Sequence, residues 1–489
     1  MKRFLHTLSN AVGKAFSKIP GPRSVPLLGT VLEYTVFGKH SFERFYKAKV
    51  ENYKKYGNIY REKIGPFTLV QLYEPHDISK VFRAEGRTPE RPAVPITIVA
   101  NKRDEIPLGL GSLNGEEWYK FRMSLQKHMM HPRAAFAYLP QQNEVADDFA
   151  NLLAQLRDDE GTVRDLYCPI QRYAIETNSV ICFNARLGCL EKAIVPGSDA
   201  DIISKATSKV FLAIQKTAFG FPWYFFYRTK QYKEFVNGRK DSARISSVYV
   251  RKAWESLQSS DRTTDRENGP NLLCSLMGSE KLSEAQVHGI LSDLFTAGFD
   301  SVSGALSFLL YNMARHPEKQ QRLYEELITV IPSDGTITEQ TLAKMHYLKS
   351  CLKESFRLNF PIEGGTTRIL NCPMTLAGYN VPKGTIIATN NQTICRDDMY
   401  FDQPDEFIPE RWLKDGSATL RPPPRFAMLP FGYGPRMCIG RRFAEQAIYL
   451  ALIKITKKFT LDYNGEPVGM LNRVFTLPDR PVDIIFKDR

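Results

Sequence analysis

The sequence of 489 residues predicts a mainly helical protein with a small β-rich part. Three stretches carry this prediction. Residues 283–315 and 441–459 repeat apolar side chains at helical spacing, whereas residues 56–73 alternate apolar and polar side chains around two glycines, as a hairpin does. Residues 135–260 also favour helices over strands.

The composition narrows the class of protein. No 18-residue apolar run is present, so no hydrophobic spanning anchor is expected. The eight cysteines are scattered without a CxxC pair, which indicates neither a disulfide framework nor a zinc site and is typical of a reducing compartment. A net charge of +13 would suit nucleic acid, anionic lipid or an acidic protein. Because no nucleic-acid motif accompanies the charge, the last two are favoured.

The first 24 residues are basic and amphipathic, and no acidic residue precedes Glu33. This pattern is typical of a mitochondrial transit peptide. We therefore predict a transit peptide over residues 1–24, cleaved near Ile19–Arg23, and a folded domain over residues 25–489. A helix lying on a membrane surface and a disordered tail are the alternatives.

A helix is predicted to start at residues 115–122, where Trp118 and Arg122 lie one turn apart on one face. A core tryptophan beside a surface arginine is the plain interpretation. Residues 219–227 are dense in aromatic side chains and broken by Gly and Pro. This loop could dip into a bilayer surface, and ordinary core packing is the alternative.

Residues 283–315 are predicted to form one long helix, because Ser283 and Gln286 suit a capping box. Its middle is nearly apolar except for Asp300 and several hydroxyls. A buried acid is costly unless it has a task or a partner. Gly298 would let a ligand approach the backbone, and the Ser301 hydroxyl could bond back to a carbonyl one turn earlier.

The stretch with the strongest chemical signal is Phe431–Gly440, FGYGPRMCIG, directly before the helix predicted over residues 441–459. Cys438 therefore lies in a glycine-rich loop at a helix N-terminus, which favours the thiolate, the form that binds a metal. Arg436 could reach a carboxylate of a flat ligand lying against this loop. A single thiolate serving as axial ligand to haem iron fits these features, and a buried structural cysteine is the alternative.

This loop resembles the cytochrome P-450 haem loop, FxxGxRxCxG, at Phe431, Gly434, Arg436, Cys438 and Gly440. The resemblance extends over nearly the whole chain from Pro20. It implies the P-450 fold, with a long central helix over the haem and a small β-rich lobe, in one domain. It also implies haem b as cofactor and a monooxygenase acting on a lipophilic substrate, either sterol-like or a foreign compound.

Three further elements resemble motifs of that family. Ala297, Gly298, Asp300 and Ser301 resemble its oxygen-binding motif, in which the acid and the alcohol deliver protons. Here serine replaces the usual threonine and Val302 takes the next hydroxyl position, which puts the coupling efficiency in doubt.

The other two elements concern propionates and the core. The resemblance places Trp118, Arg122 and Arg368 at the haem propionates. Glu354 and Arg357 resemble the family's ExxR pair, joined by Arg411 of a PERF-like element into a satisfied network.

The resemblance is to mitochondrial members in particular, because a spanning N-terminal helix is missing. It implies a [2Fe–2S] ferredoxin that docks near four cations and passes on electrons from NADPH through ferredoxin reductase; these are Lys349, Lys353, Arg441 and Arg442. A generic solvated basic face is the alternative. The implied location is peripheral, on the matrix side of the inner membrane, with contact through residues 219–227.

Two other functions remain open. A haem-thiolate protein could rearrange a peroxide or dehydrate without external electrons, although the Asp300–Ser301 pair argues against it. A non-enzymatic haem sensor or lipid carrier would need neither proton delivery nor docking lysines.

Overall fold

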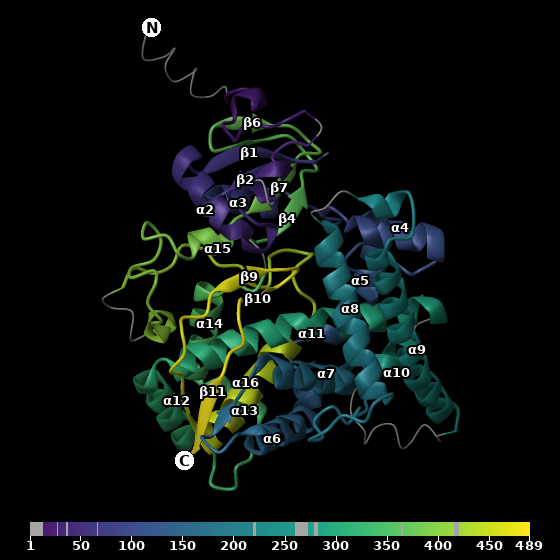
Figure 1. The fold of residues 1–489 in the computed structure, drawn as a ribbon, viewed down its shortest axis with the longest axis vertical. Coiled ribbons are helices and arrows are strands. Elements are labelled where there is room, and N and C mark those ends of the chain that lie inside the picture. The colour runs from purple at the N-terminus through teal and green to yellow at the C-terminus, as the bar shows by residue number, and fades with distance from the viewer. Residues whose placement is uncertain are drawn as a thin grey trace.

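The computed structural model describes residues 13–26, 28–35, 38–65, 67–218, 222–259, 272–277, 282–362, 365–414 and 420–489. A β-rich lobe near the N-terminus sits on a larger helical body (Figure 1). This division confirms the predicted fold class.

The α-helices are α2 (Phe45–Tyr56), α3 (Pro75–Arg83), α4 (Pro95–Asp104), α5 (Gly115–Met129), α6 (Leu139–Leu156), α7 (Tyr167–Phe183), α8 (Asp199–Ala218), α9 (Lys230–Ser259), α10 (Leu272–Met277), α11 (Glu284–Ala314), α12 (Pro317–Val330), α13 (Glu339–Lys344), α14 (His346–Leu358), α15 (Asn391–Ile394) and α16 (Arg441–Lys458). The strands are β1 (Ile59–Ile64), β2 (Phe67–Leu72), β3 (Thr162–Val163), β4 (Thr367–Ile369), β5 (Met374–Leu376), β6 (Tyr379–Val381), β7 (Ile386–Thr389), β8 (Phe459–Asp462), β9 (Met470–Asn472), β10 (Thr476–Pro478) and β11 (Ile484–Asp488).

The main sheet of the β-rich lobe has the order β1-β2-β7-β4. β1 and β2 form the predicted hairpin, with Ile59 opposite Leu72 and Ile64 opposite Phe67. β7 runs parallel to β2, and β4 is antiparallel to β7. This sheet brings Arg368, in β4, into the buried core of the lobe.

Helix α11 crosses the middle of the helical body (Figure 1) and packs against α7, α9, α14 and α16. The predicted capping box is present, because Ser283 Oγ accepts from the Gln286 N–H and the Gln286 side chain accepts from the Ser283 N–H. Residues 286–314 are long and apolar enough to cross a membrane, but 78% of the most apolar window is buried inside the protein. The apolar character of α11 is therefore that of a core helix.

The segment from Gly13 to Arg23 packs onto the β-rich lobe. The Lys14 N–H donates to the Gly378 carbonyl, the Arg61 N–H donates to the Pro20 carbonyl, and Ile19 is buried. Residues 13–23, which fall within the predicted transit peptide, thus pack against the β-rich lobe. Residues 1–12 of the predicted transit peptide lie outside the described residues.

Candidate functional site

The cysteine loop is held by its own backbone. The Cys438 N–H donates to the Phe431 carbonyl over 2.8 Å, and Gly434 has a φ of +77°. A Cβ on Gly434 would also lie 2.9 Å from a carboxylate oxygen of Glu85, so only glycine fits. Gly440 differs: its φ is −85° and an added Cβ would meet no described protein atom within 4 Å. The loop therefore leaves open space beside the start of α16.

Cys438 faces an enclosed interior space. Its side chain is exposed, yet burial among surrounding protein is the main cause that raises its pKa above the usual thiol value. The two observations agree if the thiol borders a hollow inside the protein. The Gly440 N–H and Arg122 lower the pKa, but by less than burial raises it. The N–H at the helix N-terminus thus favours the thiolate, while burial opposes it.

Arg436 is buried against Trp118, with its guanidinium carbon 4.9 Å from the indole centroid. Its Nη atoms donate to the Pro89 and Leu113 carbonyls and to Asn114 Oδ1. Its Nε is buried and lacks a partner among the described residues. Burial lowers the pKa of Arg436 to about 9, and repulsion from nearby arginines adds to the effect.

Four arginines surround this region: Arg91, Arg122, Arg368 and Arg436. Among the described residues, Glu85 is the one carboxylate that pairs with any of them, through Arg368 Nε. Burial raises the pKa of Glu85 to about 7, although Arg368 opposes the shift. Glu85 Oε2 and Arg368 Nη2 are buried without a partner among the described residues. With four arginines and one carboxylate, this site is short of negative charge.

The sequence placed Arg122 at a propionate with Trp118. In the structure Arg122 Nε instead donates to Gln126 over 3.2 Å, and its Nη2 lies 2.9 Å from the Met130 sulfur. Burial lowers its pKa to about 10, and Cys438 opposes the shift. Arg122 therefore lies in the electrostatic field of Cys438 without a carboxylate of its own.

One face of α11 borders an interior space. Ala297 is exposed although its neighbours Thr296 and Asp300 are buried. Ser301, one turn later, is half-buried, and its hydroxyl donates to the Ala297 carbonyl over 2.8 Å, as the sequence predicted. Val302 is buried in the core.

Gly298 has a second role besides the one that the sequence indicated. A Cβ at this position would overlap the Asn178 side chain of α7. The glycine thus permits close packing of α11 on α7, and it remains half-buried rather than fully buried.

Asp300 points towards α7 as well. Its carboxylate accepts a hydrogen bond of 3.0 Å from the Tyr167 hydroxyl. Burial raises the pKa of Asp300 to about 6, while Tyr167 and Arg473 lower it. Among the described residues no hydrogen bond joins Asp300 directly to Ser301, so the predicted acid–alcohol pair is not in contact.

The Glu354–Arg357–Arg411 network is present as predicted. Both Glu354 oxygens are occupied, by Arg357 at 3.0 and 2.8 Å, by Arg411 at 2.9 Å and by the Trp412 indole at 2.8 Å. The three charged side chains are fully buried. Arg357 also donates to the carbonyls of Cys395 and Glu406. This network ties α14 to the segment before the cysteine loop.

The four predicted docking cations share one surface region. Lys353, Arg441 and Arg442 are exposed, whereas Lys349 is half-buried and donates to the Ala343 carbonyl. Burial lowers the pKa of Lys349, Glu326 opposes that shift, and Lys353 and Glu445 also act on it. Because Glu445 pairs with Arg441 at 3.1 Å, α14 and the start of α16 present these charges together.

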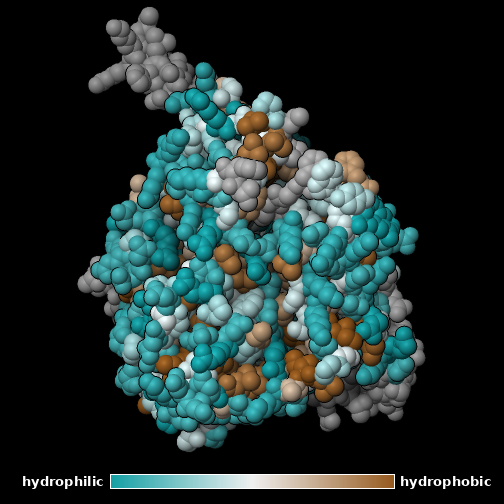
Figure 2. All heavy atoms as spheres, in the orientation of Figure 1, coloured by the Kyte–Doolittle hydropathy of each residue, from teal (hydrophilic) through white to brown (hydrophobic). Residues whose placement is uncertain are grey.

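The aromatic loop is described from residue 222 onward; residues 219–221 lie outside the described residues. Trp223, Phe225, Phe226 and Tyr227 are exposed, and Phe226 is 72% exposed. Only Tyr224 is buried in the adjacent core. Core packing is therefore wrong for four of these five side chains. Elsewhere, the face in Figure 2 is largely hydrophilic, with hydrophobic residues in small separate patches.

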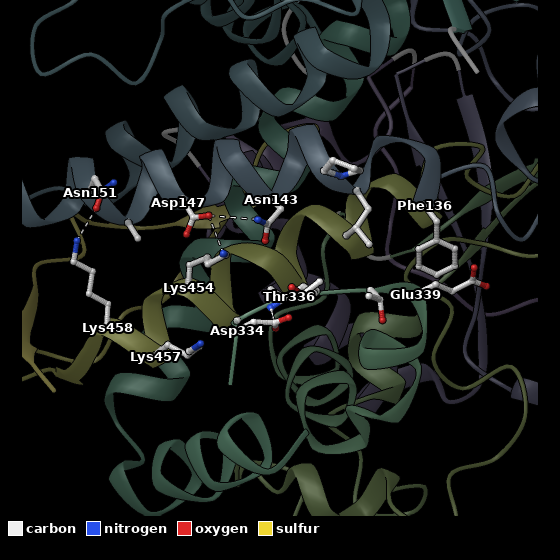
Figure 3. A pocket seen from close by; sticks show the side chains of 16 residues that line it. Phe136, Asn143, Asp147, Asn151, Asp334, Thr336, Glu339, Lys454, Lys457 and Lys458 are labelled. Atoms are coloured by element: carbon white, nitrogen blue, oxygen red, sulfur yellow. Dashed lines mark hydrogen bonds and ion pairs between the residues drawn. The ribbon is translucent and has the colours of Figure 1, made fainter. Parts of the chain in front are cut away.

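A separate groove of about 1090 Å³ lies between α6, the C-terminal part of α16 and residues 334–339 (Figure 3). Lys454 and Lys458 bind Asp147 and Asn151 there, at 2.8 and 2.7 Å. Lys457 also lines it and is exposed. Cys438 and Asp300 do not line this groove, so its volume says nothing about the site on α11.

These features define a haem-thiolate protein, and the comparisons with known proteins agree. The family model described as Cytochrome P450 matches residues 19–486, so the chain belongs to the cytochrome P450 family. A mouse protein named 1,25-dihydroxyvitamin D(3) 24-hydroxylase, mitochondrial, is 32% identical over 97% of this chain and 89% of its own. Cytochrome P450 10 of Lymnaea stagnalis is 32% identical, covering 97% of this chain and 86% of its own length. Cytochrome P450 302a1, mitochondrial, of Drosophila melanogaster is 31% identical over 96% and 94%.

The chain is thus a cytochrome P450 monooxygenase whose cofactor is haem, which this family binds through a cysteine thiolate. The observed residues fit the cofactor. Cys438 offers a thiol to an enclosed space, Gly440 leaves room beside it, and the arginines lack the negative charge that two propionates would bring.

Sequence reasoning missed Glu85, Arg91 and Tyr167. Glu85 and Arg91 lie in the irregular stretch between α3 and α4, where no periodic pattern distinguishes one charge from another. Tyr167 is 133 residues from its partner Asp300. The one available signal was the unpaired buried acid, which required a donor somewhere in the fold.

Proposed function

We propose that this protein is a mitochondrial haem-thiolate monooxygenase that hydroxylates a lipophilic small molecule, either sterol-like or a foreign compound. The observation that carries the proposal is the Cys438 thiol, accessible within an enclosed interior and flanked by partner-deficient arginines. Two of the three relatives described above carry the word mitochondrial in their names, and one of these is named a 1,25-dihydroxyvitamin D(3) 24-hydroxylase.

Within this proposal the Cys438 thiolate would bind the haem iron, and the bound haem would supply the oxidising chemistry. Phe431 and Gly440 shape the loop around the ligand. Arg436, stacked on Trp118, and Arg368 hold the propionates together with Arg91 and Arg122. Arg436 Nε and Arg368 Nη2, which are buried without a partner among the described residues, support this assignment.

Proton delivery is assigned to Asp300 and Ser301. A carboxyl with a pKa of about 6 exchanges protons readily near neutral pH. Ser301 lies on the open face of α11 beside Ala297, at the correct side to hand a proton into the interior. Asp300 must turn from Tyr167 or act through water, because it does not bond directly to Ser301.

Electrons are proposed to arrive singly from NADPH through ferredoxin reductase and a small acidic [2Fe–2S] ferredoxin. The shared exposed surface of Lys353, Arg441 and Arg442, with Lys349 at its edge, supports this partner. The exposed aromatics Trp223, Phe225, Phe226 and Tyr227 support peripheral contact with the matrix side of the inner membrane.

The transit peptide is proposed to end before Gly13. Residues from Gly13 onward contribute hydrogen bonds and a buried isoleucine to the β-rich lobe, so cleavage at residue 24 would remove part of the fold. N-terminal sequencing of the protein recovered after its import into mitochondria tests this boundary. A mature N-terminus after residue 19 would contradict the revised boundary.

The function is tested by a CO-difference spectrum of protein lacking residues 1–12. It is reduced once through the mitochondrial ferredoxin chain and once through the microsomal diflavin reductase. The red-shifted band of a thiolate-ligated CO complex is expected with ferredoxin alone. If the band appears with the diflavin enzyme alone, the proposed mitochondrial electron donor is wrong, whereas thiolate ligation of the haem stands. No such band even with dithionite, in protein shown to hold haem, would overturn Cys438 ligation.

A further inference from the structure

The open face of α11 continues beyond the proposed catalytic residues. Asp293, Ala297 and Ser301 are spaced four residues apart, so they lie along one face of the helix. Each is exposed or half-buried, whereas most of the helix is buried. Eight residues at a rise of ~1.5 Å place Asp293 about 12 Å along the helix from Ser301.

Asp293 is not alone on this face. Its Oδ1 accepts a hydrogen bond of 2.8 Å from Arg239 of α9, and Arg239 also donates to the Pro107 carbonyl over 3.4 Å. The side chains are 24% and 10% exposed. A Cβ on Gly109 would overlap the Asp293 carboxylate, so this glycine lets residues 107–109 close over the pair. Two helices and a loop thus converge on one ion pair.

Arg91 lies near both the pair and Cys438. Burial lowers the pKa of Arg91 to about 10, and Cys438 and Asp293 both oppose that shift. Arg91 is therefore within electrostatic reach of both groups.

An ion pair is an unexpected lining for a space that takes lipophilic molecules. Withdrawing two charges from water costs free energy that their mutual attraction only partly returns, unless further hydrogen bonds form. Asp293 Oδ2 can accept a further hydrogen bond, because no described residue donates a hydrogen bond to it. A hydroxyl group could donate to that oxygen and accept from the guanidinium at once.

We infer that the Arg239–Asp293 pair, about 12 Å along α11 from Ser301, is a recognition site for a hydroxyl group at the far end of an elongated lipophilic substrate. This inference rests on the proposed function. An alkane lacking the hydroxyl would leave both charges desolvated without compensation. A carboxylate at the same end would be repelled by Asp293, so the pair also selects against acids.

The test is an equilibrium titration of the haem-loaded protein with three steroid probes that differ at one end: 5α-androstan-3β-ol, 5α-androstane and a 3-carboxylate analogue. Binding is followed by the spin-state change of the haem spectrum, without any reductase. In the natural protein the alcohol is expected to bind ~10-fold or more tightly than the alkane, the value of one hydrogen bond to a charged group. The carboxylate is expected to bind most weakly.

The variants Asp293→Asn and Arg239→Gln are expected to reduce the alcohol-to-alkane ratio to about threefold or less. Asp201→Asn, which removes an acid from an exposed pair with Lys205, is the matched control and is expected to keep the full ratio. A CO-difference spectrum on each variant confirms that haem and thiolate ligation are retained.

Three results would overturn the inference. The alcohol and the alkane could bind equally in the natural protein, which needs no variant to fold. The two site variants could weaken both probes equally, as a purely structural ion pair would. The alcohol could fail to change the spin state of haem-loaded protein at all. None of these results depends on ferredoxin. They are therefore independent of whether the proposed electron donor is correct.

Discussion

Two buried clusters of arginines lie on either side of the cysteine loop, and they differ in how their positive charge is balanced. In the Glu354 cluster one carboxylate receives Arg357, Arg411 and an indole N–H, and the guanidinium of Arg357 also reaches backbone carbonyls. In the second cluster four arginines share only Glu85. In the first cluster two arginines share one fully bonded carboxylate, although Arg411 Nη1 is buried without a partner among the described residues, whereas in the second cluster four arginines share one carboxylate.

The difference separates a structural ion network from a site prepared for an anionic ligand. Burial lowers the pKa values of Arg91 and Arg436 to about 10 and 9, and raises that of Glu85 to about 7. Each shift marks a charge that the folded chain alone does not stabilise. Two propionates would supply the missing charge, so the second cluster should depend on haem and the first should not.

The largest effect is expected from Glu354→Gln. Removing this anion leaves two fully buried guanidinium groups facing each other, which costs about 3–5 kcal/mol of the free energy of unfolding. Urea denaturation with and without haem measures it. Asp405→Asn is the control, because Asp405 is exposed and its pair with Arg396 should contribute about 0–1 kcal/mol. Equal losses in the two variants would contradict the comparison.

The next effect concerns Asp300, a buried carboxyl that accepts a hydrogen bond from the Tyr167 hydroxyl. No cation lies at hydrogen-bond distance from it among the described residues. Asp300→Asn is expected to lower product formation about 100-fold, the contribution of a general acid. In the natural protein the fraction of protonated Asp300 falls as pH rises through about 6, so product formed per NADPH should fall too. The variant should lose this pH dependence.

The same shift has a consequence for stability. The folded-state pKa of Asp300 exceeds the usual carboxyl value, so the folded protein binds more protons between pH 4 and 6. Its contribution to stability is therefore present at low pH and is lost as pH rises through about 6. Asp300→Asn should remove that part of the pH dependence of unfolding. An unchanged profile would contradict the burial of an ionisable carboxyl here.

A smaller effect sharpens the contrast between the clusters. Arg91→Gln removes a cation whose side chain donates, among the described residues, to the Gly111 carbonyl through Nε. The rate of haem loss to an excess of a haem-scavenging protein should rise ~10-fold, for one charge-assisted bond to a propionate. Stability without haem should change by less than about 1 kcal/mol. A large loss without haem would show that both clusters are structural.

The smallest effect concerns surface charge, where solvent screens every pair. Lys353→Glu should raise the KM for a [2Fe–2S] ferredoxin about tenfold at low salt, and the difference should shrink as salt increases. Lys457→Glu makes the same charge change on α16, about 24 Å along that helix from Arg441, in the groove of Figure 3. It should leave the KM unchanged. Equal effects would indicate net charge alone.

The sequence by itself determined the features that local chemistry controls. The FGYGPRMCIG loop, the Ser283–Gln286 capping box, the hairpin of β1 and β2 and the spacing of Glu354 and Arg357 all depend on backbone conformation or on residues a few positions apart. A short stretch of sequence determines backbone dihedrals and side-chain periodicity, and these predictions are confirmed.

Only the tertiary structure decided which distant side chains meet. Glu85 lies 283 residues from Arg368, Asp300 lies 133 from Tyr167, and Arg239 lies 54 from Asp293. Packing also gave Gly298 a neighbour in Asn178 and outweighed the helix N-terminus in setting the pKa of Cys438. Such pairings depend on how whole helices pack and on the desolvation that follows, and neither quantity is carried by any local stretch of sequence.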